Sequence, residues 1–270
     1  MLNKILAHKR LEIAALDEAE LRRQAQDGPP PRPFLPYAGA GHVWLIAELK
    51  RASPSRGLLA PNLDLAEVAR IYAHNGAAAI SVLTDAEFFM GQLDTLRALR
   101  ASADHLPPLL RKDFILSPAQ LYQTRAAGAD AVLLIVAALP GDGDEPGALP
   151  SLHALALELG LAPLVEVHSL PELERALRLP GLRLVGINNR NLATFDVQLE
   201  TTLALRPHIP PSIRVVSESG IFTAADVSRL AAAGVDAVLV GEALITAPDI
   251  AAKVRELSGV ALPREEQARG

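Results

Sequence analysis

Short apolar runs alternate with amphipathic stretches along most of this chain. Eight apolar runs start roughly 22–35 residues apart, at 43–47, 78–83, 108–111, 131–136, 162–167, 184–187, 214–217 and 237–240. Between them lie Ala- and Leu-rich stretches with helical periodicity, at 64–75, 94–103, 118–127, 152–159, 171–179 and 224–233. The spacing is that of a strand followed by a helix, and such uniformly apolar strands are typical of a parallel sheet covered on both faces.

Eight such units predict an α/β fold, the (β/α)8 TIM barrel. A doubly wound open sheet is the alternative, but it usually has fewer strands and often carries a glycine-rich turn after the first; residues 48–57 contain no such turn. Residues 2–26 form one amphipathic segment, and the proline-rich stretch 27–33 cannot be helical. We therefore expect a single domain over 1–270, with an N-terminal helical cap and connector at 1–42 and the barrel at 43–255.

Composition narrows the class of protein. The chain has a net charge of −5, 50% hydrophobic residues and no cysteine. The lack of cysteine excludes disulfides and thiolate chemistry, and a mildly acidic chain lacks the basic character expected of a nucleic-acid-binding protein. The longest apolar run, 131–139, is shorter than the roughly 20 residues of a membrane-spanning helix. We expect a cytoplasmic protein that binds neither nucleic acid nor membrane.

Charged residues follow several of the predicted strands. In a barrel of this type the active site lies at the C-terminal ends of the strands, where this sequence places Glu48 and Lys50, Lys112, Glu166, and Glu218. Glu166 lies within an apolar run, and a buried carboxylate needs a partner. Lys112 or Lys50 could be that partner across the barrel mouth, and converging Lys and Glu side chains favour acid–base chemistry.

Two glycine-containing turns follow the last two strands, at 217–220 and 240–243. Backbone N–H groups in such turns bind phosphate, and barrels often bind phosphate at this position. Seven histidines show no metal-ligand spacing, and we expect His168 to begin the loop after the fifth strand. Spacing alone favours a core position for Phe89.

Five motifs, in order at strand ends, resemble the indole-3-glycerol phosphate synthase family of tryptophan biosynthesis. They lie at 46–55, 109–114, 164–168, 186–192 and 217–221, and the resemblance extends to the N-terminal helix. It implies ring closure of 1-(2-carboxyphenylamino)-1-deoxyribulose 5-phosphate with loss of carbon dioxide and water, giving indole-3-glycerol phosphate. It also implies that no cofactor and no metal takes part.

The resemblance assigns catalytic roles to five charged residues. Lys112 would be the general acid that protonates the substrate ketone, and Glu166 the general base that aids dehydration. Lys50 would hold the substrate carboxylate or, alternatively, protonate the departing hydroxyl group. Glu48 would orient Lys50, and Glu218 would support the lysine–glutamate network.

The resemblance also implies a set of residues around the substrate. Asn188 and Arg190 would line the site near the leaving groups, and Ser53 would lie in a mobile loop after the first strand. Phe89 and Phe114 would pack around the anthranilate ring, in place of the core position that spacing favours for Phe89. The phosphate-binding turns would contain Ser219, Gly220, Gly241 and Glu242.

Without the family resemblance, the residues alone leave three alternative identities open. Phosphoribosylanthranilate isomerase and the tryptophan synthase alpha subunit share phosphate turns but not Lys at the third strand with Glu at the fifth and seventh. A non-catalytic barrel that senses a sugar phosphate would not need an intact acid and base. We expect a phosphorylated small-molecule substrate and a monomer, with a dimer left open.

Overall fold

The computed structural model describes most of the chain: residues 1–35, 41–53, 57–58, 63–102, 105–141, 145, 147–191, 194 and 196–262, with the backbone alone at 52, 53 and 58. The predicted site residue Ser53 lies in a short strand, and its side chain is outside the described part of the structure.

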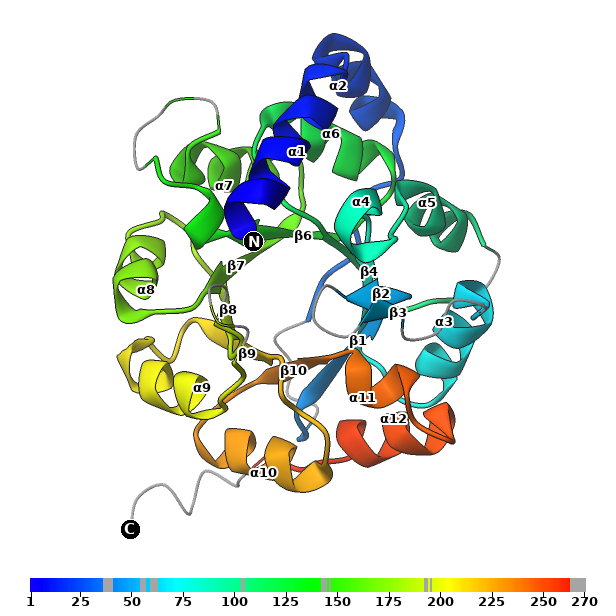
Figure 1. The fold of residues 1–270 in the computed structure, drawn as a ribbon, viewed down its shortest axis with the longest axis vertical. Helices are drawn as coiled ribbons and strands as arrows, with labels where there is room; N and C mark the ends of the chain where they lie inside the picture. Colours follow the sequence, from blue (N-terminus) through cyan, green and yellow to red (C-terminus); the bar gives the residue numbers. More distant parts are fainter. Residues whose placement is uncertain are drawn as a thin grey trace.

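Within the described residues, eight parallel strands close into a barrel (Figure 1), which confirms the (β/α)8 prediction. In chain order the strands are β1 (Trp44–Leu49), β4 (Ala79–Leu83), β5 (Leu109–Lys112), β6 (Ala131–Ile135), β7 (Ala162–Val167), β8 (Leu184–Asn188), β9 (Arg214–Glu218) and β10 (Ala237–Val240). Pairing of β1 with both β4 and β10 closes the ring.

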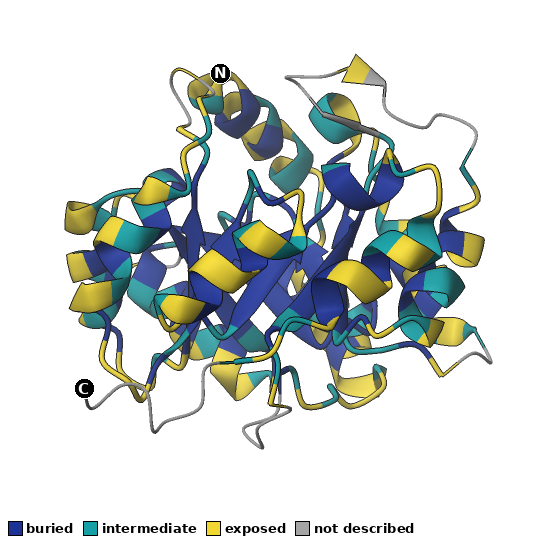
Figure 2. Ribbon diagram, turned by 90° about the horizontal axis from the view of Figure 1, so that it is seen from below, coloured by how far each residue is buried: buried dark blue, intermediate teal, exposed yellow. Residues whose placement is uncertain are grey.

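Helices surround the barrel and expose their outer faces (Figure 2). The longer ones are α3 (Leu65–His74), α5 (Leu93–Ala101), α6 (Pro118–Ala126), α7 (Leu149–Glu158), α8 (Leu170–Leu177), α10 (Ala224–Ala232) and α12 (Ile250–Ser258). Shorter elements are α4 (Ala86–Phe89), α9 (Glu200–Leu205), α11 (Glu242–Ile245), the hairpin strands β2 (Ala52–Ser53) and β3 (Gly57–Leu58), and the 3-10 turns η1 (Val136–Ala138) and η2 (Arg206–His208). The sequence pattern did not predict these shorter elements, because a segment of two to six residues has too few positions for a period to show.

The N-terminal segment forms two helices, α1 (Leu2–Ala14) and α2 (Glu18–Asp27), instead of one continuous helix. The break falls at Asp17, whose side chain accepts a hydrogen bond from the Glu20 backbone N–H at 3.0 Å and so starts a new helix. Helix α2 packs against α6, while α1 reaches over the barrel rim (Figure 1). The N-terminal cap is therefore a bent pair of helices.

The strands alternate between two apolar clusters. One cluster fills the space between strands and helices, and Val132 and Leu134 belong to it. The other fills the barrel interior and includes Ile46, Leu110, Leu133, Leu164 and Val216. This two-sided burial explains why the strands read as continuous apolar runs.

Candidate active site

A cavity of about 480 Å³ opens at the C-terminal ends of the strands. Its lining contains the predicted site residues Glu48, Lys50, Phe89, Lys112, Phe114, Glu166, Asn188, Arg190, Ser219, Gly220, Gly241 and Glu242. Glu218 contacts Lys112 from beneath the lining, and Ser53 is the predicted site residue whose side chain is not described. The structure thus brings the predicted residues to one place, and their roles stay predictions.

Strand alternation explains why these side chains converge. Ile46, Leu110, Leu164 and Val216 belong to the barrel interior. Two residues further along the same strands come Glu48, Lys112, Glu166 and Glu218. Because side chains two apart in a strand point to the same face, the charged residues form the layer directly above the apolar interior.

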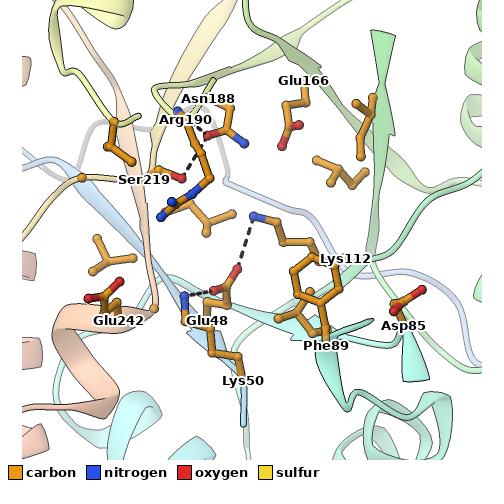
Figure 3. Close-up of a pocket in the computed structure, with 18 of the residues that line it drawn as sticks. Glu48, Lys50, Asp85, Phe89, Lys112, Glu166, Asn188, Arg190, Ser219 and Glu242 are labelled. Carbon is orange, nitrogen blue, oxygen red and sulfur yellow. Dashed lines mark hydrogen bonds and ion pairs between the residues drawn. The ribbon is translucent and has the colours of Figure 1, made fainter. Parts of the chain in front are cut away.

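Glu48 joins the two lysines at the cavity floor (Figure 3). Its Oε1 lies 2.9 Å from the Lys50 Nζ, and its Oε2 lies 3.2 Å from the Lys112 Nζ. Burial alone would raise the pKa of Glu48, but the two ammonium groups lower it to about 2. Glu48 is therefore ionised at neutral pH and fixes the positions of both cations.

Lys112 lies between two carboxylates, with its Nζ also 3.2 Å from the Glu218 Oε2. Burial would lower the pKa of Lys112, but Glu48, Glu218 and Glu166 outweigh burial and raise it. In this geometry the effect of the carboxylates on the pKa of Lys112 is larger than the effect of burial. Lys112 is a cation at neutral pH.

Glu218 is fully buried, and the nearby Lys112 cation does not offset the cost of burying its charge. Burial raises its pKa to about 8, with the Glu166 and Glu48 charges acting in the same direction and Lys112 opposing them. Among the described residues, its Oε1 has no hydrogen-bond partner. That oxygen lies over Gly186, where an added Cβ would be 2.3 Å away, so a side chain at 186 would displace the carboxyl group.

Glu166 lies across the cavity from Glu48 and Lys50, with the Lys112 ammonium between them (Figure 3). The sequence suggested a lysine partner for this carboxylate. The structure gives Lys112 only a longer-range influence: the closest charged contact is His168, whose Nε2 is 3.3 Å from the Glu166 Oε1. His168 does begin the loop after β7, as expected, but its side chain turns back toward the strand end.

Asn188 organises the turn after β9. Its Oδ1 accepts a hydrogen bond from the Ser219 Oγ at 2.9 Å and from the Arg190 backbone N–H at 3.0 Å. Ser219 and Gly220 both have positive φ, 68° and 78°, a conformation that is rare for a residue with a Cβ. Held in this way, the turn presents its backbone to the cavity.

Gly241 allows the backbone after β10 to approach the charged residues. An added Cβ there would lie 2.3 Å from the Glu48 Oε1 and 3.0 Å from the Lys50 Nζ. A side chain at position 241 would therefore displace the Glu48 carboxylate and the Lys50 ammonium group. The turn leads into α11, so the backbone at Gly241 and Glu242 borders the cavity from the side opposite Phe89.

Apolar side chains form the other wall. The ring centroids of Phe89 and Phe114 are 6.2 Å apart, and both rings are half-buried. The core position that spacing favoured for Phe89 is thus wrong: α4 places the ring at the cavity edge. Leu2 and Ile5 of α1 also line the cavity, so this wall is continuous with the N-terminal cap.

Sequence reasoning missed a buried cation on α1. Lys9 is 2% exposed, and its Nζ lies 2.8 Å from the Asp85 Oδ2 and 3.0 Å from the Asp113 Oδ1. Asp85 caps α4, which carries Phe89, and Asp113 follows Lys112. The available signal was position: Lys9 is four residues after the core residue Ile5, on the same helix face.

The described residues include neither a metal-binding cluster nor a membrane-spanning helix. They contain no group of three or more His, Asp or Glu side chains arranged to hold a metal ion. None of the helices among them is both long and apolar enough to cross a membrane.

Comparison with known proteins gives a consistent result. Residues 2–257 match the family model described as indole-3-glycerol phosphate synthase. The protein of that name from Roseiflexus castenholzii is 53% identical, with 96% of this chain and 98% of the relative covered, and one from Dehalococcoides mccartyi is 54% identical, covering 83% and 87%. Among solved structures, 3-hexulose-6-phosphate synthase from Salmonella typhimurium has a TM-score of 0.60 at 19% identity, covering 80% of this chain and 97% of that one. That likeness supports the barrel fold alone.

Proposed function

The chain belongs to the indole-3-glycerol phosphate synthase family, and we propose that the cavity at its barrel mouth carries out the ring closure of that family. The enzyme is a carboxy-lyase of tryptophan biosynthesis: it converts 1-(2-carboxyphenylamino)-1-deoxyribulose 5-phosphate to indole-3-glycerol phosphate, carbon dioxide and water. The observation that carries the assignment of the site is that Lys112 on β5 and Glu166 on β7 face one cavity.

The cavity contains cations that can bind an anionic substrate. Lys50, Lys112 and Arg190 line it, together with the carboxylates of Glu48, Glu166 and Glu242. The substrate has a carboxylate at one end and a phosphate at the other. In this proposal Lys50 binds the carboxylate, while the phosphate takes backbone N–H groups from the Ser219–Gly220 and Gly241–Glu242 turns. Because the Glu242 carboxylate would repel a phosphate, this proposal assigns only the backbone of Glu242 to phosphate binding.

Ring closure needs a proton donor at the ketone. As the aromatic carbon attacks the ketone carbon, negative charge develops on its oxygen, and the Lys112 ammonium donates a proton there. The raised pKa of Lys112 keeps the donor charged, at the cost of a weaker driving force for transfer. The Glu218 Oε2 lies 3.2 Å from the Lys112 Nζ, and the raised pKa of Glu218 suits it to return a proton to Lys112.

Decarboxylation and dehydration complete the indole ring. The ring-closed intermediate accepts the electron pair of the breaking carbon–carboxylate bond, and loss of carbon dioxide restores the benzene ring. The hydroxyl group on the former ketone carbon then leaves as water, with a proton supplied by Lys112 or Lys50. Glu166 takes the proton from the neighbouring carbon, which forms the double bond. The Phe89 and Phe114 rings hold the anthranilate ring in place.

The assembly and location follow as inferences from this site. All the residues assigned to it belong to one chain, so we infer that a monomer is active. We also infer a cytoplasmic location, because the substrate is a phosphorylated biosynthetic intermediate.

Turnover of the named substrate tests the proposal. The purified protein is mixed with 1-(2-carboxyphenylamino)-1-deoxyribulose 5-phosphate, and indole fluorescence is followed. We expect steady product formation, unchanged when the exposed Lys4 is replaced in Lys4→Ala. Tight binding of the phosphate ester without product would instead identify a non-catalytic sensor of sugar phosphates.

A further inference from the structure

His168 connects the carboxylate of Glu166 to a second carboxylate at the surface. Its Nδ1 lies 3.1 Å from the Glu172 Oε2, and its backbone N–H donates to the same oxygen at 2.9 Å. On the other side, its Nε2 lies 3.3 Å from the Glu166 Oε1, a charge contact in which the ring N–H is not aligned as a hydrogen bond. Glu172 is in the first turn of α8, so the three side chains run from the strand end to the helix.

Exposure increases along this series. The side chain of Glu166 is 3% exposed, that of His168 is 10% exposed and that of Glu172 is 21% exposed. Burial would lower the pKa of His168, but the two carboxylates raise it to about 10. The imidazole is therefore a cation across the neutral range, held between two anions.

Within the described part of the chain, three further groups act strongly on the charge of Glu166. They are Lys112 from β5, Asn188 from β8 and Glu218 from β9, and the last of these is acidic. Burial would raise the pKa of Glu166, whereas His168 first, and then Lys112 and Asn188, bring it below its usual value. Of these, His168 has the largest lowering effect, and it is outside the cavity lining.

We propose that His168 and Glu172 are positioning residues for Glu166: the doubly held imidazolium keeps this carboxylate ionised and fixes its direction toward the substrate. The inference rests on the proposed function, in which Glu166 is the general base. A base must be unprotonated before it can accept a proton, and a buried carboxylate without a nearby cation would be protonated at higher pH.

Glu172 has a distinct part in this unit. An imidazolium next to a single carboxylate and close to the buried interior would lose its proton at lower pH than one held by two. Glu172 therefore maintains the charge of His168, and His168 passes the effect to Glu166. A purely structural role, in which Glu172 only caps the chain at the start of α8, would not involve the charge of Glu166.

The pH profile of kcat/KM distinguishes the two roles. His168→Gln removes the cation, and we expect the acid limb to move up by about one pH unit or more, a roughly tenfold loss of kcat/KM at a pH on that limb. Because His168 does not line the cavity, KM at the optimum pH should stay within about twofold of the wild-type value. Glu172→Gln keeps an acceptor for the backbone N–H but removes the charge, so a smaller shift in the same direction is expected.

Glu174→Gln is the matched control, because Glu174 is an exposed carboxylate on the same helix. Its profile should coincide with that of the wild type. If circular dichroism shows that His168→Gln is unfolded, Glu172→Gln serves as the test. In addition, ¹⁵N NMR of the wild type should show both His168 ring nitrogens protonated at pH 8.

Two outcomes would overturn the inference: an acid limb in both variants that matches the control, or a neutral His168 ring at pH 7. Glu166→Gln separates this failure from failure of the proposed function. If Glu166→Gln is inactive and the His168 variant keeps the wild-type limb, only the positioning role is wrong. If Glu166→Gln remains fully active, the assignment of the base itself is wrong.

Discussion

At the scale of single residues, Glu218 shows a conflict between folding and chemistry. It is fully buried, one of its oxygens has no hydrogen-bond partner among the described residues, and its pKa is raised to about 8. A carboxyl group with these properties destabilises the fold once it ionises, because the Lys112 cation does not offset its burial and the neighbouring Glu166 and Glu48 charges. The same properties let it hold a proton beside Lys112, which the proposed mechanism uses. Stability is lowered here at a position to which the proposed mechanism gives a role.

Replacing this group should change how stability depends on pH. A folded-state pKa above the unfolded value means that the native state binds more protons between about pH 4.5 and 8, so wild-type stability falls as pH rises through that range. Glu218→Gln removes this loss while it keeps an amide oxygen for Lys112. We expect urea titrations to give the variant an advantage over the wild type that is larger at pH 8.5 than at pH 5.5, by on the order of 3 kcal/mol. An equal difference at both pH values would contradict the raised pKa.

At the scale of elements, the N-terminal helix α1 is part of the site and not an appendage. Its apolar residues Leu2 and Ile5 line the cavity, and Lys9 fixes the helix to Asp85 and Asp113. Asp85 caps helix α4, which carries Phe89, and Asp113 directly follows Lys112. The position of α1, of the aromatic wall and of the proposed acid is therefore set by one buried ion cluster.

Lys9→Met tests this coupling. The substitution leaves two buried aspartates without their shared cation, and breaking a buried ion pair costs about 3–5 kcal/mol. Arg111 and Thr84 still contact Asp113, which favours the lower end of that range. We expect faster amide hydrogen exchange in α1 and a higher KM, because the apolar wall moves. The exposed Lys4→Met on the same helix is the control, and unchanged exchange in α1 of the Lys9 variant would refute the coupling.

Elements differ in how far the sequence predicts them. The barrel strands are predictable because strands such as β6 and β7 are buried on both faces and must be apolar on both. A charged residue at the end of such a strand is therefore easy to recognise in the sequence. The break at Asp17 was missed because the apolar positions on either side fit one helical period. Lys9 was missed, and the contact of His168 with Glu166 was not predicted, because their partners are distant in the chain or around a turn, which no local pattern records.

At the scale of the whole molecule, the barrel brings three cations of an acidic chain to one cavity, together with the carboxylates that hold them. The net charge is −5, yet Lys50, Lys112 and Arg190 line one cavity. Parallel strands that end at the same rim make this possible, because each supplies one side chain to a common layer. The fold holds the proposed acid, Lys112, and the proposed base, Glu166, on separate strands that border one cavity.

Replacing Lys112 tests the central claim most directly. Lys112→Met removes the proposed general acid and keeps most of the side-chain volume, so the barrel should remain folded by circular dichroism. We predict that kcat for indole-3-glycerol phosphate formation falls by about 10²–10⁴-fold. Lys4→Ala, measured in parallel, should keep the wild-type rate. Turnover by folded Lys112→Met within a few-fold of the wild type would contradict the account.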